Sequence, residues 1–159
     1  MPSQVLTAQD ITGPWVNFLR AHAAVTRQLS ARLEAAHGLT LSDFDVLVQL
    51  YYAPERSLRR VDIARAVLLT ASGITRLLDG LERAGWVEKR ACETDARVSY
   101  AVLTDAGLEK FEAARRSHLA DVEQLFGSRF SDEERELLAE LLGRLPQAET
   151  SPGCTTDCE

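Results

Sequence analysis

Hydrophobic residues recur at intervals of three and four along most of this chain. Such spacing gathers the apolar side chains on one face and predicts amphipathic helices. Six segments show it: 10–36, 42–52, 57–68, 70–84, 105–126 and 130–145. Residues 86–90 and 99–104 instead contain Val, Tyr and Trp in partial alternation, which predicts two strands. The pattern therefore predicts a mainly α fold with a small β-hairpin.

Residues that favour helix ends flank these segments. A hydroxyl side chain that can accept a hydrogen bond from a first-turn amide begins five of them: Ser42, Ser57, Thr70, Thr104 and Ser131. Asp45 and Glu134 lie three residues after Ser42 and Ser131, so two capping boxes are expected. Gly85 follows the 70–84 segment, where a left-handed residue commonly ends a helix.

Two of the short helices are separated by little more than Leu69. Helices 57–68 and 70–84, joined by so tight a turn, form a helix-turn-helix. The hairpin follows directly, with a charged connection over residues 91–98 that is too long for a two-residue turn. A helix-turn-helix followed by a charged hairpin is a winged helix, which suits binding to DNA.

This region resembles the MarR family of transcriptional regulators, and the resemblance covers residues 15–145. Its helix motif is present as Thr70, Ser72, Thr75, Arg76, Leu81, Glu82, Gly85, Trp86 and Val87. Its wing motif is present as Asp95, Arg97, Leu103, Thr104 and Gly107. Gly80 departs from the family pattern, which more often has a charged residue there. The resemblance implies a winged helix-turn-helix with terminal helices that interlock two subunits into a homodimer.

The length of 159 residues suits one domain. We expect a flexible N-terminus over 1–9, a MarR-like domain over 10–146 and a flexible tail over 147–159. Within the domain, the winged helix spans about 42–104. The dimerisation helices span about 10–36 and 105–145, and they are too apolar to remain uncovered.

Charge is distributed unevenly along the chain. The total is −6, but residues 56–100 contain nine basic and six acidic residues. That region therefore carries +3 and the remainder −9. An acidic chain with a basic reading surface is expected to bind double-stranded DNA through local fit rather than through a global cationic field.

Residues of the predicted winged helix have side chains suited to DNA. Ser72 and Thr75 have short hydroxyls for bases or phosphates, and Arg76 has a planar fork for guanine or phosphate. Arg97 at the wing tip is expected in the minor groove, oriented by Asp95. Further phosphate contacts are expected from Arg59, Arg60 and Arg90.

A small effector is also expected. Trp15, Asp45, Arg76 and Arg90 resemble the ligand-binding set of the urate-responsive branch of the family. An indole and two guanidiniums suit a flat anion, and a carboxylate accepts ring N–H groups. A purine-like anion and another small aromatic or phenolic acid both remain open as effectors. Each of the four residues also has an ordinary structural reading, as an interface aromatic, a helix cap or a phosphate contact.

The three cysteines provide an alternative, a thiol redox sensor. Cys92 lies in the wing beside basic residues, which favour the reactive thiolate, and Cys154 and Cys158 lie in the tail. With an odd number of cysteines, no signal peptide and no long apolar run, a cytoplasmic location is expected.

Other function classes find little support in the sequence. It contains no nucleophile elbow, phosphate loop or dinucleotide fingerprint, so no catalytic residues and no cofactor are expected. The three histidines are scattered singly, and no metal site is expected. A winged helix that binds another protein stays a weaker alternative, because such a surface would be apolar, whereas this one carries arginines.

Overall fold

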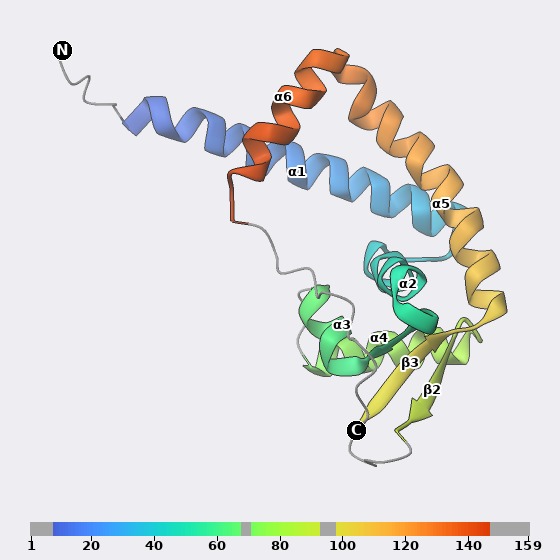
Figure 1. Ribbon diagram of the computed structural model, residues 1–159. Helices are drawn as coiled ribbons and strands as arrows, with labels where there is room; N and C mark the ends of the chain where they lie inside the picture. The colour runs from blue at the N-terminus through green and yellow to red at the C-terminus, as the bar shows by residue number, and fades with distance from the viewer. Residues whose placement is uncertain (1–7, 68–70, 93–97, 147–159) are drawn as a thin grey trace.

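The computed structural model describes residues 8–67, 71–92 and 98–146. Its elements form a winged helix at one end and long helical arms at the other (Figure 1). The arms are α1 (Ala8–His37), α5 (Asp105–Leu125), the 3-10 turn η2 (Gly127–Arg129) and α6 (Asp132–Gly143). The winged helix contains α2 (Leu41–Tyr52), η1 (Pro54–Arg56), β1 (Ser57–Arg59), α3 (Arg60–Ala66), α4 (Ala71–Arg83), β2 (Val87–Ala91) and β3 (Ser99–Leu103).

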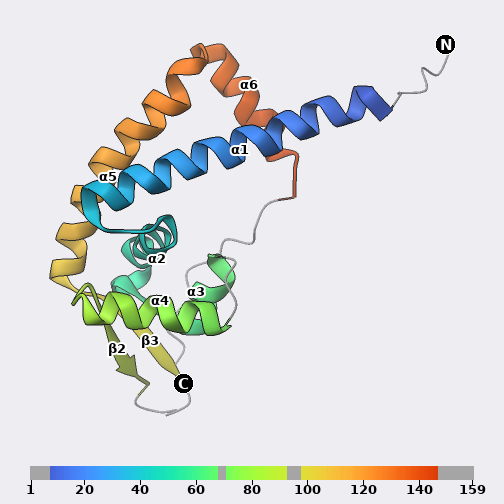
Figure 2. The same cartoon turned by 180° about the vertical axis from the view of Figure 1, so that it is seen from behind.

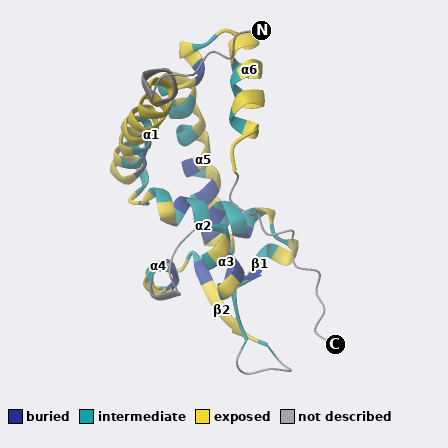
Figure 3. Ribbon diagram, turned by 90° about the vertical axis from the view of Figure 1, so that its left-hand side faces the viewer, coloured by how far each residue is buried: buried dark blue, intermediate teal, exposed yellow. Residues whose placement is uncertain are grey.

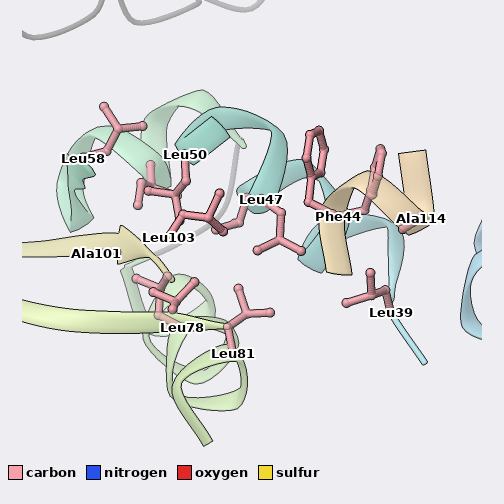
Figure 4. Close-up of a cluster of buried hydrophobic side chains, with 14 of the residues drawn as sticks. Leu39, Phe44, Leu47, Leu50, Leu58, Leu78, Leu81, Ala101, Leu103 and Ala114 are labelled. Atoms are coloured by element: carbon pink, nitrogen blue, oxygen red, sulfur yellow. The ribbon is translucent and has the colours of Figure 1, made fainter. Parts of the chain in front are cut away.

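The sheet of the winged helix is antiparallel, with strand order β1-β3-β2. Leu58 pairs with Ala101, and Lys89 pairs with Ala101 from the other side. Inward-facing residues of the sheet meet the apolar faces of α2 and α4 in one core, in which Leu47, Leu50 and Leu81 are almost inaccessible to solvent (Figure 4). The mainly helical fold with a small β wing, expected from the sequence, is confirmed.

Several helix ends agree with the sequence. Ser131 and Glu134 form the expected capping box of α6, and Thr104 caps α5 by accepting a hydrogen bond from the Gly107 amide at 3.0 Å. Gly85 has φ of +75°, the left-handed conformation expected after α4. The predicted cap at Thr70 lies outside the described residues.

Two predicted helix starts are wrong. The capping box of α2 is formed by Thr40 and Asp43, not by Ser42 and Asp45, because the cap lies two residues earlier than predicted and the helix begins at Leu41. Ser57 does not cap a helix, because residues 57–59 form β1 along β3 and the helix starts only at Arg60. At α2 a competing local cap, Thr40, replaced the predicted one. At Ser57 the pairing of β1 with β3 prevailed over the helical pattern. At the N-terminus, α1 begins at Ala8, two residues before the predicted start.

The helix α5 follows directly after β3 of the winged helix and packs along the C-terminal half of α1. Arg32 on α1 donates to Asp121 on α5 at 2.7 Å, and the His37 ring lies 2.6 Å from the Ser117 hydroxyl. Leu33 of α1 is buried beside these contacts. The half of α1 nearest the winged helix is therefore held within the chain.

The rest of the arms is exposed. The N-terminal half of α1 extends past the other elements, and α6 crosses at a distance from it, as the view from behind and the side view show (Figures 2 and 3). None of the residues of α6 is buried. Large apolar side chains remain exposed on both helices: Trp15, Val16, Phe18, Leu19, Leu137, Leu141 and, just after α6, Leu145. None of the described helices is both long and apolar enough to cross a membrane.

Candidate nucleic-acid interface

The helix α4 has one buried face and one exposed face. Ile74, Leu78 and Leu81 are buried in the core, so the helix is held firmly along its length. Thr75 and Arg76 lie on the exposed side. A helix anchored by an apolar stripe and presenting a hydroxyl and a guanidinium is suited to the major groove. The side chain of Ser72 is outside the described part of the structure.

Arg59, just before α3, and Arg60, the first residue of α3, are more enclosed than the sequence suggested. Arg59 and Arg60 line a groove together with Thr75 of α4 and Ser99 of β3. The Arg60 guanidinium lies 4.0 Å from the Asp79 carboxylate of α4, and only 24 % of its side chain is exposed. Arg60 thus links the start of α3 to the middle of α4. The helix α4 is the second helix of the helix-turn-helix, the one termed the recognition helix in this architecture.

The described part of the wing presents positive charge. Arg90 on β2 is about half exposed and lies 3.5 Å from Glu88 on the same strand. Cys92 is half-buried, and its amide donates to the Val98 carbonyl at 3.0 Å, which closes the hairpin. The predicted tip residues Asp95 and Arg97 lie outside the described residues, as do Cys154 and Cys158.

Asp45, the acidic member of the predicted ligand set, lines a hollow between α2 and α5. Its described neighbours there are Leu41, Ser42, Phe44, Val48 and His118, so Trp15, Arg76 and Arg90 are not among them. Burial raises the pKa of the Asp45 carboxyl, partly offset by a hydrogen bond with Gln49. An effector that contacts all four predicted residues would therefore need groups that this single chain does not bring together.

His118 is the functional candidate that the sequence did not single out. Its ring lies 4.7 Å from that of Phe44, and its Nδ1 atom is buried without a hydrogen-bond partner among the described residues. Burial lowers the pKa of the His118 imidazole, and the nearby Asp121 carboxylate partly opposes this. One signal was available: His118 follows Phe111 and Ala114 at helical spacing and so shares their buried face.

Comparison with known proteins agrees with this architecture. The family model described as "MarR family" matches residues 37–98. A curated relative from Bacillus subtilis, the HTH-type transcriptional regulator YdgJ, is 31 % identical over 121 residues, covering 76 % of this chain and 72 % of that protein. The chain belongs to the MarR family. MhqR, a further HTH-type transcriptional regulator of Bacillus subtilis, is 29 % identical over 126 residues, and the alignment covers 79 % of this chain and 84 % of MhqR.

Solved structures of MarR-family regulators include complexes with DNA. The Streptomyces coelicolor regulator Sco3205, in complex with DNA, superposes with a TM-score of 0.80 at 27 % identity, covering 89 % of this chain and 88 % of that one. The MepR–DNA complex of S. aureus gives a TM-score of 0.69 at 26 % identity, covering 82 % and 98 %. YdgJ, MhqR and Sco3205 are all transcriptional regulators by name. The chain is a DNA-binding transcriptional regulator of the MarR type.

Among the described residues of this MarR-family chain, no group of three or more His, Cys, Asp or Glu side chains is arranged to hold a metal ion. The described residues form two candidate functional sites. One is the exposed face of α4 with the base of the wing, and the other is the hollow between α2 and α5.

Proposed function

We propose that this regulator binds a palindromic operator as a homodimer and that a small ligand releases it. The observation that carries the proposal is the division of α4 into a buried stripe and an exposed face with Thr75 and Arg76. The buried stripe keeps the helix rigid relative to the sheet. The exposed face then meets base edges, while Arg90 and the wing residues Asp95 and Arg97 serve the backbone and the minor groove.

The uncovered arms support the homodimer. Trp15 on α1 is 56 % exposed and Leu137 on α6 is 54 % exposed, and both belong to longer apolar faces. A second copy of the chain can cover these faces through a twofold axis. The same axis places two recognition helices about one turn of DNA apart, which matches a palindromic site.

The hollow beside Asp45 supports binding of an effector. Phe44 and Val48 supply apolar walls, and Asp45, Ser42 and His118 supply polar groups. That combination suits a small aromatic compound with hydrogen-bonding groups, whether a purine-like anion or a phenolic acid. The hollow lies between the arm α5 and the winged helix, so an occupant there acts on their relative position.

Release then requires only a shift between two dimer states. A ligand that binds more tightly to a dimer with wrongly spaced recognition helices populates that dimer, and the operator is vacated. The protein acts as a repressor in this scheme.

The test starts with the DNA. Duplexes selected by the purified protein from a random library should contain a palindrome, and their affinity should be measured across a range of salt concentrations. Replacing Arg97 by Ala should weaken binding strongly and reduce the salt slope by about one unit, because one phosphate-neutralising charge is lost. Arg129→Ala, in the arm turn η2, is the matched control. Unchanged affinity and slope for Arg97→Ala would reject the assignment of the wing.

The effector is tested separately. Urate, other purines, salicylate and related phenolic acids should be added to a thermal melt, since a ligand that binds only the native state raises the melting temperature. A shift that Asp45→Ala abolishes supports the hollow. A shift that survives Asp45→Ala but is lost in Arg90→Ala would place the ligand at the wing instead.

A further inference from the structure

The joint between the recognition helix and the arm α5 is built on two residues of the wing motif that also form the N-terminal cap of α5, Thr104 and Gly107. The end of α4 forms a tight turn, in which the Gly85 amide donates to Glu82 and the Trp86 amide donates to Leu81 at 3.0 Å. This pair of bonds is a Schellman motif, which ends the helix at a left-handed glycine. Both carbonyls that leave the turn, those of Gly85 and Trp86, face the start of α5.

The Thr104 hydroxyl joins the two helices through one oxygen atom. It donates to the Gly85 carbonyl at 2.7 Å and accepts from the Gly107 amide at 3.0 Å. The Thr104 amide also donates to the Trp86 carbonyl at 3.1 Å. The last turn of the recognition helix and the first turn of the arm are therefore bound to the same residue.

Gly107 is required because the backbone of α5 lies very close to the turn after α4, and not because of an unusual backbone conformation. A Cβ atom added to it would lie 2.0 Å from the Trp86 carbonyl oxygen and 2.8 Å from the Leu103 side chain. The carbonyl belongs to the backbone and cannot rotate away, so any larger residue at position 107 must displace α5 from the turn. On the outer side, the Lys110 ammonium of α5 lies 4.9 Å from the centre of the Trp86 ring.

Because α5 is long, a small change in its tilt at the joint displaces its C-terminal end by a large distance. The 21 residues of α5 span about 31 Å at about 1.5 Å per residue. A tilt of about 10° at the joint displaces the far end by roughly 5 Å, more than the roughly 3.4 Å between successive base pairs. In a homodimer formed through the arms, a change in the angle at the joint would therefore change the distance between the two recognition helices.

We propose that Thr104 and Gly107 are positioning residues that set the half-site spacing recognised by the dimer. The inference rests on the proposed function, since it needs a homodimer on a palindromic DNA site. It predicts that changes at the joint alter which spacing is preferred, while contacts of one winged helix with one half-site stay intact.

The test uses the full chain and duplexes selected by the wild-type protein. Each variant is titrated with the selected palindrome, with palindromes one base pair longer or shorter between half-sites, and with a single half-site. Thr104→Ser keeps the bridging hydroxyl and should retain the wild-type ratio of affinities. Thr104→Val and Gly107→Ala should change that ratio at least threefold, with the single half-site affinity unchanged. Circular dichroism and sedimentation check that each variant is folded and dimeric.

The outcomes separate the two proposals. If wild-type protein selects no DNA, the proposed function fails and the inference falls with it. If the wild type selects a palindrome, and Thr104→Val keeps the parental spacing ratio or weakens all duplexes equally, the inference alone is overturned. Should Gly107→Ala fail to fold, the comparison of Thr104→Ser with Thr104→Val decides the result.

Discussion

The winged helix and the arms use their leucines in opposite ways. In the winged helix, Leu47 and Leu81 are almost completely buried between α2, α4 and the sheet. In the arms, Leu137 and Leu141 project from a helix in which no residue is buried. Figure 3 shows this contrast as dark residues in the winged helix and along α5, beside the largely exposed helices α1 and α6. The difference indicates that the winged helix has a core of its own within one chain, whereas the apolar side chains of α6 and of the N-terminal half of α1 are left uncovered by the described residues.

Charge divides the chain in a similar way. Residues 56–100 carry +3, while the remainder carries −9. On α6, acidic residues occupy the first turn, where they favour the positive end of the helix dipole. This division of charge agrees with the expectation that the winged helix, rather than α6, is the part of the chain that approaches DNA.

The largest effect is expected from a charge placed in the arms. Leu141→Asp should weaken dimerisation at least about 100-fold and abolish binding to a palindrome, because an unpaired buried carboxylate costs several kcal/mol. Sedimentation velocity measures the dimer, and Glu140→Gln at the neighbouring exposed position is the control. A Leu141→Asp protein that remains dimeric would show that α6 lies outside the interface.

Replacing a leucine by alanine should affect stability differently in the winged helix and in the arms. Leu47→Ala in the core should lower the free energy of unfolding by about 2–5 kcal/mol, whatever the protein concentration. Leu137→Ala should lower stability by an amount that depends on protein concentration, since in the proposed homodimer its packing partner belongs to another molecule. Urea denaturation at two concentrations measures both. Identical behaviour of the two variants would remove the distinction between the regions.

Within the winged helix, function and stability should separate on α4. Arg76→Ala should weaken DNA binding by about 1–3 kcal/mol with little change in melting temperature, because the side chain is exposed. Arg83→Ala, at the other end of the same helix, is the control for DNA affinity. Equal losses in both variants would indicate general electrostatics rather than a specific contact.

Replacement by alanine should change stability in opposite directions at Gly80, inside the recognition helix, and at Gly85, just after its end. A Cβ at Gly80 would meet nothing within 4 Å, so Gly80→Ala should raise the free energy of unfolding by about 0.5–1 kcal/mol through helix propensity. Gly85 has φ of +75°, so Gly85→Ala should lower it by about 1–2 kcal/mol. Thermal and urea unfolding test both changes. A loss of stability in Gly80→Ala would mean that the helix needs its flexibility.

The smallest effect concerns pH. The pKa of His118 is lowered in the folded protein by burial, so the unfolded chain binds the proton more readily. As far as His118 is concerned, the folded protein therefore keeps its full stability at pH values above 6.5, the ordinary pKa of histidine. It loses stability as the pH falls from 6.5 through the lower pKa that His118 has in the folded state. His118→Gln should flatten this decline in urea unfolding, and His22→Gln on exposed α1 should not. An unchanged decline in His118→Gln would assign it to other groups.

Much of the fold was predictable because its signals are local. The apolar spacing of residues 130–145 and the capping box of Ser131 with Glu134 involve neighbours three and four positions apart. Gly85 marked the end of α4 because few other residues adopt a left-handed backbone. The motif residues around Thr75 and Arg76 also identified the family, and the structure places both residues on the exposed face of α4.

Other features arise only when distant segments meet. Ser57 resembled a helix cap by its neighbours, yet β3, more than forty positions away, draws it into a strand. Arg60 meets Asp79, and His118 meets Phe44, across separations at which periodicity carries no information. Local geometry follows from the chain itself, because the helix repeat places near neighbours on one face. Contacts between distant residues depend on how whole elements pack, and the same local pattern permits many such packings.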